Sequence, residues 1–134
     1  MKILIVEDDP VASALLVNIL QSDGYQATVA DDGEVAWALL DDPGRYFDVV
    51  LLDLSLPKLD GISLWGRIRS SPFLRSVEVI PCTASSDRAT VLKVAQLGAH
   101  HYMVKPINPE KLRTALGNVQ QQLPAGVERN LVVC

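Results

Sequence analysis

Five short runs rich in isoleucine, valine and leucine recur along the chain, with about 20 to 30 residues between their starts. The runs are Ile3–Val6, Ala27–Ala30, Phe47–Leu52, Val77–Cys82 and Tyr102–Val104. Continuous apolar runs of this length are typical of strands buried on both faces of a parallel sheet. Between them lie stretches in which apolar residues repeat at helical spacing. The alternation predicts a (βα)5 chain of the α/β class, with a doubly wound five-stranded parallel sheet.

Several predicted helices have suitable residues at their ends. Asp9 is expected to cap the first helix, with Pro10 at its first position and Gly24 just past its end. Asp32 and Ser86 are expected to begin two later helices in the same way.

The chain is long enough for one domain. It has 134 residues, of which 49% are hydrophobic, and a formal net charge of −4. A fold of this size buries enough apolar surface without disulfides or a structural metal, and the composition is too apolar for a disordered chain. We expect a domain over residues 1–123, whose last helix covers about residues 109–123, and a tail or the start of a linker over 124–134.

Composition and patterning also exclude some locations and partners. No apolar stretch approaches the roughly 20 residues of a membrane-spanning helix, and acids interrupt Ile3–Val6 before it could form a secretory signal. The two cysteines, Cys82 and Cys134, form neither a disulfide framework nor a metal-ligand cluster, so a cytoplasmic location fits best. Net negative charge without a Lys/Arg cluster argues against direct nucleic-acid binding by this domain.

Acids, a hydroxyl and an ammonium group stand where four of the predicted strands end. In chain order these residues are Glu7, Asp8 and Asp9, then Asp53, then Thr83 and Ala84, and finally Lys105 and Pro106. Open parallel sheets bind their ligands outside the carboxyl ends of the strands. We therefore expect these side chains to converge at one edge of the sheet.

This set of groups suits phosphoryl transfer with a magnesium ion. Mg²⁺ prefers oxygen ligands, which Asp8 and Asp53 can supply. Asp53 follows an apolar run, where an unpaired carboxylate is costly, and a carboxylate can attack phosphorus to form an aspartyl phosphate. The transition state carries charge on three equatorial oxygens, which the metal, Lys105 and Thr83 could each neutralise.

Each of these residues also has a purely structural explanation. Asp8 and Asp9 can simply cap a helix, Thr83 can be an ordinary residue at a strand end, and Lys105 can be a solvated lysine with a buried stem. The coincidence of four strand ends favours the functional interpretation.

Four segments, in order along the chain, resemble the receiver domains of two-component response regulators over about residues 1–123. They are Ile3–Asp9, Val49–Gly61, Ile80–Ala84 and Gly98–Pro106. The resemblance implies a flavodoxin-like strand order of 2-1-3-4-5 and a bacterial signalling switch. Such a switch is not an enzyme in the usual sense, since it catalyses only its own phosphotransfer and autodephosphorylation.

The resemblance also implies a role for each site residue. Asp53 is expected to accept a phosphoryl group, and Asp8, Asp53 and the backbone carbonyl of Ser55 are expected to bind Mg²⁺. Glu7 would complete the acidic pocket. Thr83, Ala84 and Lys105 would bind the phosphate, with Tyr102 changing rotamer as Thr83 moves, and Lys105–Pro106 would be a cis peptide. Pro57 and Asp60–Gly61 would shape the loop beside the acceptor.

The partners that the resemblance implies are proteins. The donor would be a histidine kinase or a histidine phosphotransfer protein, with specificity on the first helix and the loop after the fifth strand, at Ala12, Leu15, Pro106 and Ile107. The surface of the fourth helix, fifth strand and fifth helix would signal to a downstream protein or a linked output domain. A phosphorylation-dependent dimer is a further implied state.

Three features depart from the family pattern or are left unassigned by it. His100 and His101 stand where many DNA-binding relatives have two acids, which weakens the case for their charge-paired dimer. Neighbours on a strand point to opposite faces, so these two histidines do not suit one shared metal. Cys82 is expected to be a small buried hydrophobe, and Trp37 and Trp65 to be packing residues.

Other functions stay open at this point. A phosphate-independent binding module with a receiver fold would be marked by a missing acid, acceptor or lysine, and none of these is missing. A haloacid-dehalogenase-like phosphatase needs a second acid two residues after its nucleophile, where this chain has Ser55. A flavin carrier of the flavodoxin type would have its phosphate repelled by Glu7–Asp9.

Overall fold

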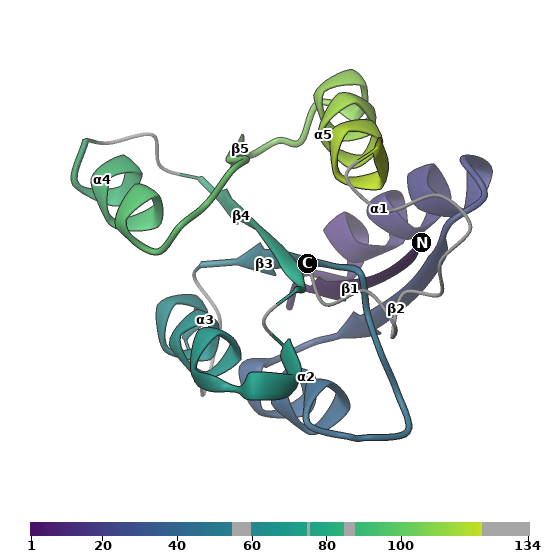
Figure 1. Cartoon of the computed structure of the whole chain (residues 1–134). Helices are drawn as coiled ribbons and strands as arrows, with labels where there is room; N and C mark the ends of the chain where they lie inside the picture. The colour runs from purple at the N-terminus through teal and green to yellow at the C-terminus, as the bar shows by residue number, and fades with distance from the viewer. Residues whose placement is uncertain (55–59, 75, 85–87, 122–134) are drawn as a thin grey trace.

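The strands and helices alternate along the chain as the sequence predicts (Figure 1). The computed structural model describes residues 1–54, 60–74, 76–84 and 88–121. In chain order the elements are β1 (Lys2–Val6), α1 (Pro10–Ser22), β2 (Gln26–Ala30), α2 (Gly33–Leu40), β3 (Val49–Asp53), α3 (Gly61–Ser70), η1 (Pro72–Leu74), β4 (Glu78–Thr83), α4 (Arg88–Gln96), β5 (Met103–Val104) and α5 (Pro109–Gln121). Ser55, Pro57, Ser86 and the predicted tail lie outside the described residues.

The five strands form one parallel sheet in the order β2-β1-β3-β4-β5, which confirms the predicted fold class and order. The predicted strand boundaries differ from the structure by one or two residues, and two of the differences bear on the site. Phe47 and Asp48 precede β3, whose last residue is Asp53, and Tyr102 precedes the two-residue β5. Pairing explains the first difference, because Asp53 is in register with Cys82 of β4 and so continues the ladder.

Helices cover both faces of the sheet, as a doubly wound fold requires (Figure 1). Buried residues of α1 and α5 form one core with alternate residues of the central strands, while α2, α3 and α4 contribute to a second core on the other face. Alternation along β1 shows the division, since Ile3 and Ile5 face the first core and Leu4 and Val6 the second. Trp65 of α3 is fully buried in the second core, which confirms its packing role.

Capping residues set the starts of two helices as predicted. Asp9 accepts a hydrogen bond from the Val11 backbone N–H at 3.0 Å, and Asp32 accepts one from the Val35 N–H at 2.8 Å. Gly24 has a φ of +86° shortly after the last residue of α1, a conformation that favours glycine.

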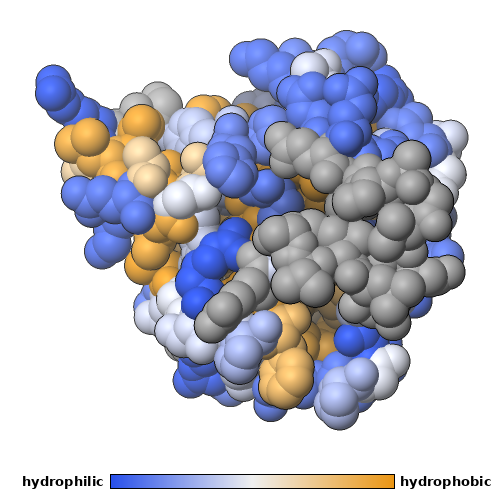
Figure 2. All heavy atoms as spheres, in the orientation of Figure 1, coloured by the Kyte–Doolittle hydropathy of each residue, from blue (hydrophilic) through white to orange (hydrophobic). Residues whose placement is uncertain are grey.

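The α4 helix is held by few buried side chains. Val94 is its buried residue, while Val91 and Leu92 are exposed, and Figure 2 shows apolar side chains gathered over this part of the molecule. Val104 of the adjacent edge strand β5 is 41% exposed as well. In the part of the chain that the structure describes, no helix is long and apolar enough to cross a membrane.

Candidate functional site

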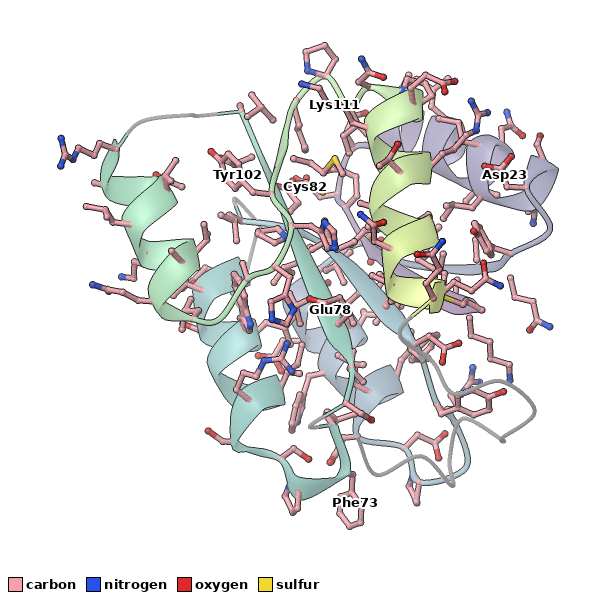
Figure 3. The ribbon with its side chains drawn as sticks, turned by 45° about the horizontal axis from the view of Figure 1, so that its top comes forward. Asp23, Phe73, Glu78, Cys82, Tyr102 and Lys111 are labelled. Atoms are coloured by element: carbon pink, nitrogen blue, oxygen red, sulfur yellow. The ribbon has the colours of Figure 1, made fainter. Side chains whose placement is uncertain are left out.

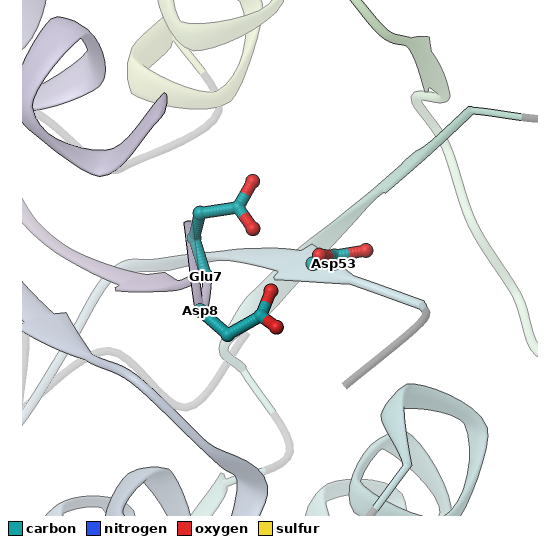
Figure 4. A group of neighbouring side chains, drawn as sticks. All are labelled: Glu7, Asp8 and Asp53. Atoms are coloured by element: carbon teal, nitrogen blue, oxygen red, sulfur yellow. The ribbon is translucent and has the colours of Figure 1, made fainter. Parts of the chain in front are cut away.

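Three carboxylates meet at the carboxyl ends of β1 and β3. Glu7 and Asp8 follow β1 and Asp53 is the last residue of β3. One carboxylate oxygen from each of the three lies within 4.8 Å of the others (Figure 4). Glu7 is 4% exposed and Asp53 is 6% exposed, whereas Asp8 is open to solvent. The register of β1 and β3, which pairs Val6 with Leu52, carries the acids that follow these residues to the same edge. The predicted convergence of the strand ends is therefore observed.

Lys105 holds two of these acids together. Its Nζ donates to Glu7 Oε1 at 2.6 Å and to Asp53 Oδ2 at 3.1 Å. Burial acts to lower the pKa of Lys105, but the hydrogen bonds to Glu7 and Asp53 outweigh it and raise that pKa above its ordinary value. Burial raises the pKa of Glu7, and the hydrogen bond from Lys105 opposes this shift. The site thus pairs a clustered negative charge with one ammonium group.

The end of β4 completes this edge. Thr83 is buried, and its backbone carbonyl accepts a 2.7 Å hydrogen bond from the Lys105 N–H. The Lys105–Pro106 peptide is cis. Ala84, the next residue after β4, is exposed.

Tyr102 lies just before β5 and packs against the core shared by α2, α3 and α4. Figure 3 shows Tyr102 and Cys82 toward one end of the sheet and Phe73 at the opposite end. Tyr102 is half-buried, so it lies between this core and the surface.

The three clustered acids suit a hard divalent cation. Each offers carboxylate oxygens, the ligand type that Mg²⁺ prefers, and Asp8 is accessible from solvent. Ser55, whose carbonyl was expected to be a further ligand, lies outside the described residues. The acidic cluster therefore has the chemistry of a metal site.

Two structural features were not foreseen from the sequence. The resemblance implies a bound phosphate as the partner of Lys105, but in this structure the shorter of its two hydrogen bonds goes to Glu7. The sequence pattern places His100 and His101 on a strand, whereas in the structure both residues precede β5. His100 Nδ1 instead lies 3.0 Å from Glu78 Oε1, so a partner on β4 accounts for its placement.

Other predicted residues take ordinary structural positions. Cys82 is a free, buried thiol whose pKa burial raises to about 12, which confirms its role as a small hydrophobe. On the surface proposed for kinase recognition, Leu15 and Pro106 are exposed, while Ala12 and Ile107 are half-buried.

The sequence is similar to one known family and to several known proteins. The response regulator receiver domain family matches residues 3–117. Chemotaxis protein CheY-3 of Vibrio cholerae is 34% identical over 124 residues, which cover 92% of this chain and 94% of that protein. The transcriptional regulatory protein KdpE of Staphylococcus aureus is 35% identical over 133 residues, covering 98% of this chain and 54% of KdpE. The chain therefore spans about half the length of that relative.

Solved structures show the same likeness. The receiver domain of sensor histidine kinase PA1611 from Pseudomonas aeruginosa has a TM-score of 0.78 and 31% identity, covering 90% of this chain and 98% of that one. That structure has a magnesium ion coordinated in its active site cleft. Chemotaxis protein CheY4 of Vibrio cholerae has a TM-score of 0.79 and 27% identity, covering 88% and 97% of the two chains.

The family match covers most of the chain and includes all the strand ends that carry the clustered acids, the threonine and the lysine. Receiver domains are signalling switches that interact with histidine kinases and output domains. With this fold, this site and these relatives, the chain belongs to the family of response regulator receiver domains of two-component signalling.

Proposed function

We propose that this domain accepts a phosphoryl group on the carboxylate of Asp53 and passes the resulting change to a protein partner. The observation that carries the proposal is the Lys105 ammonium group, which lies 3.1 Å from Asp53 Oδ2 beside two further acids. A cation already placed on the acceptor carboxylate is in reach of a phosphate formed there. Neither a capping role nor a packing role requires that arrangement.

The donor is a phosphohistidine on a histidine kinase or a histidine phosphotransfer protein. A carboxylate oxygen of Asp53 attacks phosphorus, so that a P–O bond forms while the P–N bond of the donor breaks. The electron pair of that bond returns to the imidazole nitrogen, which leaves as neutral imidazole when the other ring nitrogen carries a proton. The product is an aspartyl phosphate and an unmodified histidine.

The site residues supply positioning and neutralisation of charge. Lys105 binds one equatorial oxygen, and the hydroxyl of Thr83 binds a second, with Ala84 following it at the end of the strand. Asp8 and Asp53, with the carbonyl of Ser55, would hold Mg²⁺, and Glu7 would add to the acidic pocket. When bound, the ion supplies positive charge to the third phosphoryl oxygen.

Signalling follows from the charge that phosphorylation adds. A phosphate brings about −1.5 to −2 charge at pH 7, which draws the Thr83 hydroxyl and Lys105 toward it. Tyr102 packs against the core that α2, α3 and α4 share, so its ring can move inward as Thr83 shifts. These side-chain movements shift the population of the domain's conformations toward a state with an altered surface over α4, β5 and α5.

The partner surface is apolar where α4 and β5 are exposed. Val91, Leu92 and Val104 are each more than a third exposed, and they suit a downstream protein or a linked output domain with an apolar contact face. A phosphorylation-dependent dimer through this surface is a second use of it. Recognition of the donor is assigned to Ala12 and Leu15 of α1 and to the Pro106–Ile107 loop.

Intact mass measured with Mg²⁺ and acetyl phosphate tests the proposal. We expect a labile gain of one phosphate by the wild-type protein, lost in Asp53→Asn and abolished by EDTA. Asp42→Asn, which changes an exposed acid outside the site, is the matched control and should be phosphorylated normally. An unmodified wild-type protein would contradict the proposal and favour a phosphate-independent binding module. Steady release of phosphate from many equivalents of a phosphomonoester would instead indicate a phosphatase.

A further inference from the structure

The first residue of α3 lies directly against the backbone of the acceptor residue. A Cβ atom placed on Gly61 would be 2.6 Å from Leu54 Cα and 2.7 Å from the backbone carbonyl oxygen of Asp53. The carbonyl carbon of Leu54 would be 3.2 Å away. All three neighbours are main-chain atoms, so no side-chain rotation can make room for a methyl group. The absence of a side chain at Gly61 is therefore what lets α3 approach the end of β3 this closely.

The α3 helix is fixed in this position by its own contacts. Asp60 caps it, accepting hydrogen bonds from the Ser63 backbone N–H at 2.9 Å and from the Ser63 hydroxyl at 3.0 Å. Leu64, Trp65 and Ile68 are fully buried against the sheet. Because these side chains are closely packed, a methyl group at Gly61 cannot be accommodated simply by moving the helix outward.

The acceptor backbone is held on its other side by β4. The Leu54 N–H donates to the carbonyl of Cys82 at 3.1 Å, and Asp53 is in register with Cys82. The peptide between Asp53 and Leu54 therefore lies between β4 and Gly61. Its orientation sets where the Asp53 carboxylate points and where the chain continues toward Ser55.

We propose that Gly61 is a positioning residue for the acceptor, setting the orientation of the Asp53–Leu54 peptide so that the carboxylate meets both Lys105 and the metal-binding acids. The inference rests on the proposed phosphoacceptor function of Asp53. It assigns to Gly61 a direct effect on the geometry of the reacting group, exerted through its contact with the main chain. A displacement of the order of 1 Å at a reacting group can cost about 100-fold in rate.

Gly66 supplies a matched control within the same helix. A Cβ on Gly66 would meet no atom within 4 Å. Gly61→Ala and Gly66→Ala therefore add the same methyl group to α3, but only the first places it against the backbone of Asp53 and Leu54.

Two kinds of readout, one of backbone geometry and one of site function, separate a positioning role from a purely structural one. The first is the backbone chemical shifts of Asp53 and Leu54, recorded by NMR on the metal-free protein. The second is the initial rate of phosphorylation by acetyl phosphate at saturating Mg²⁺, together with Mg²⁺ affinity from tryptophan fluorescence. We expect Gly61→Ala to stay folded, to move the Asp53 and Leu54 shifts, and to slow phosphorylation by about tenfold or more. Gly66→Ala should leave those shifts and the rate unchanged.

The outcomes distinguish this inference from the proposed function. A folded Gly61→Ala protein that is phosphorylated and binds Mg²⁺ like the wild type overturns the positioning role, whether or not the shifts move. If the wild type takes up no phosphate, the proposed function fails, and unchanged Mg²⁺ affinity and shifts in Gly61→Ala would overturn the positioning role separately. If Gly61→Ala does not fold, Asp60→Ala serves in its place, because loss of the cap loosens the first turn of α3 without adding atoms. Phosphorylation of Asp60→Ala at the wild-type rate would then contradict the inference.

Discussion

Lys105 Nζ lies closer to Glu7 than to the proposed acceptor, at 2.6 Å from Glu7 Oε1 against 3.1 Å from Asp53 Oδ2. Glu7 is 4% exposed, so an ionised carboxylate there depends on this ammonium group for compensation. The lysine therefore has two tasks: it stabilises the buried acids of this state, and it is available to a phosphate on Asp53.

Replacement of this lysine should affect both tasks. Lys105→Met leaves Glu7 and Asp53 without their shared cation, and we expect the free energy of unfolding at pH 7 to fall by about 1–3 kcal/mol, as for loss of a hydrogen bond to a charged group. The pKa of Glu7 should rise further, because the hydrogen bond that lowers it is gone. Urea unfolding at pH 7 measures the first effect, and NMR titration of the Glu7 side chain measures the second.

Lys111→Met is the matched control for this substitution. Lys111 is exposed on α5, so removal of its charge should change stability by less than about 0.5 kcal/mol. Equal losses of unfolding free energy in Lys105→Met and Lys111→Met would show that the contacts of Lys105 with Glu7 and Asp53 add nothing specific to stability.

The fold and the site were predictable from the sequence to different extents. Apolar runs predicted the strands because β1 and β3 are buried on both faces, and Asp53 stood out as an acid directly after such a run. Because the strands of the sheet are parallel, their carboxyl ends lie at one edge, so the convergence of these ends could be predicted without the structure. By contrast, the Lys105–Glu7 hydrogen bond joins residues 98 positions apart and depends on side-chain conformation, which the sequence pattern does not carry. The contact of Gly61 with Asp53 is similarly a property of helix placement.

The Asp60 cap predicts a pH dependence of stability. The hydrogen bond from the Ser63 backbone N–H holds the pKa of Asp60 below its ordinary value of 3.8. The unfolded chain therefore takes up this proton more readily, so the stabilisation is complete above pH 3.8 and is lost as pH falls through the lower pKa of the folded state. Asp60→Asn keeps a capping oxygen but does not titrate, so its stability relative to the wild type should be constant near neutral pH and rise below pH 3.8.

Two measurements check the cap. Urea unfolding of the wild type and of Asp60→Asn, from pH 7 to pH 3, gives the difference between their free energies of unfolding at each pH. Asp60→Ala removes the cap at every pH and should lose about 0.5–2 kcal/mol at pH 7. A constant difference between the wild type and Asp60→Asn down to pH 3 would contradict the assigned pKa shift.

Burial should make Cys82 unreactive in the folded protein. Its pKa is raised to about 12, and the thiol is enclosed in the core beneath the acidic site. In a Cys134→Ser background, where Cys82 is the remaining cysteine, we expect labelling by a disulfide reagent at pH 8 to be more than about 100-fold slower than in guanidinium. Labelling at equal rates in the two conditions would place the thiol at the surface.

Magnesium should stabilise the folded protein through the clustered acids. Glu7, Asp8 and Asp53 are within 4.8 Å of one another in the folded state, a proximity that the unfolded chain does not maintain. A ligand that binds only the folded state adds about 2.7 kcal/mol to stability at 100 times its dissociation constant. We expect thermal unfolding of the wild type to shift upward with Mg²⁺, and the shift to be lost in Asp53→Asn and reduced in Asp8→Asn.

The control for this titration separates specific binding from general screening of charge. Asp42 is an exposed acid outside the site, paired with Arg45 at 3.4 Å. Asp42→Asn changes the net charge as much as the site variants do, so it should keep the full magnesium shift if the ion binds the acidic cluster. NaCl at equal ionic strength should give no such shift if the magnesium ion binds specifically. If NaCl gives the same upward shift, or if the magnesium shift persists in Asp53→Asn, the effect is assigned to screening of repulsion among the surface acids instead. A shift that depends on both Asp8 and Asp53 would assign the ion to the acidic cluster at the ends of β1 and β3, where its charge would serve the proposed phosphoryl transfer to Asp53.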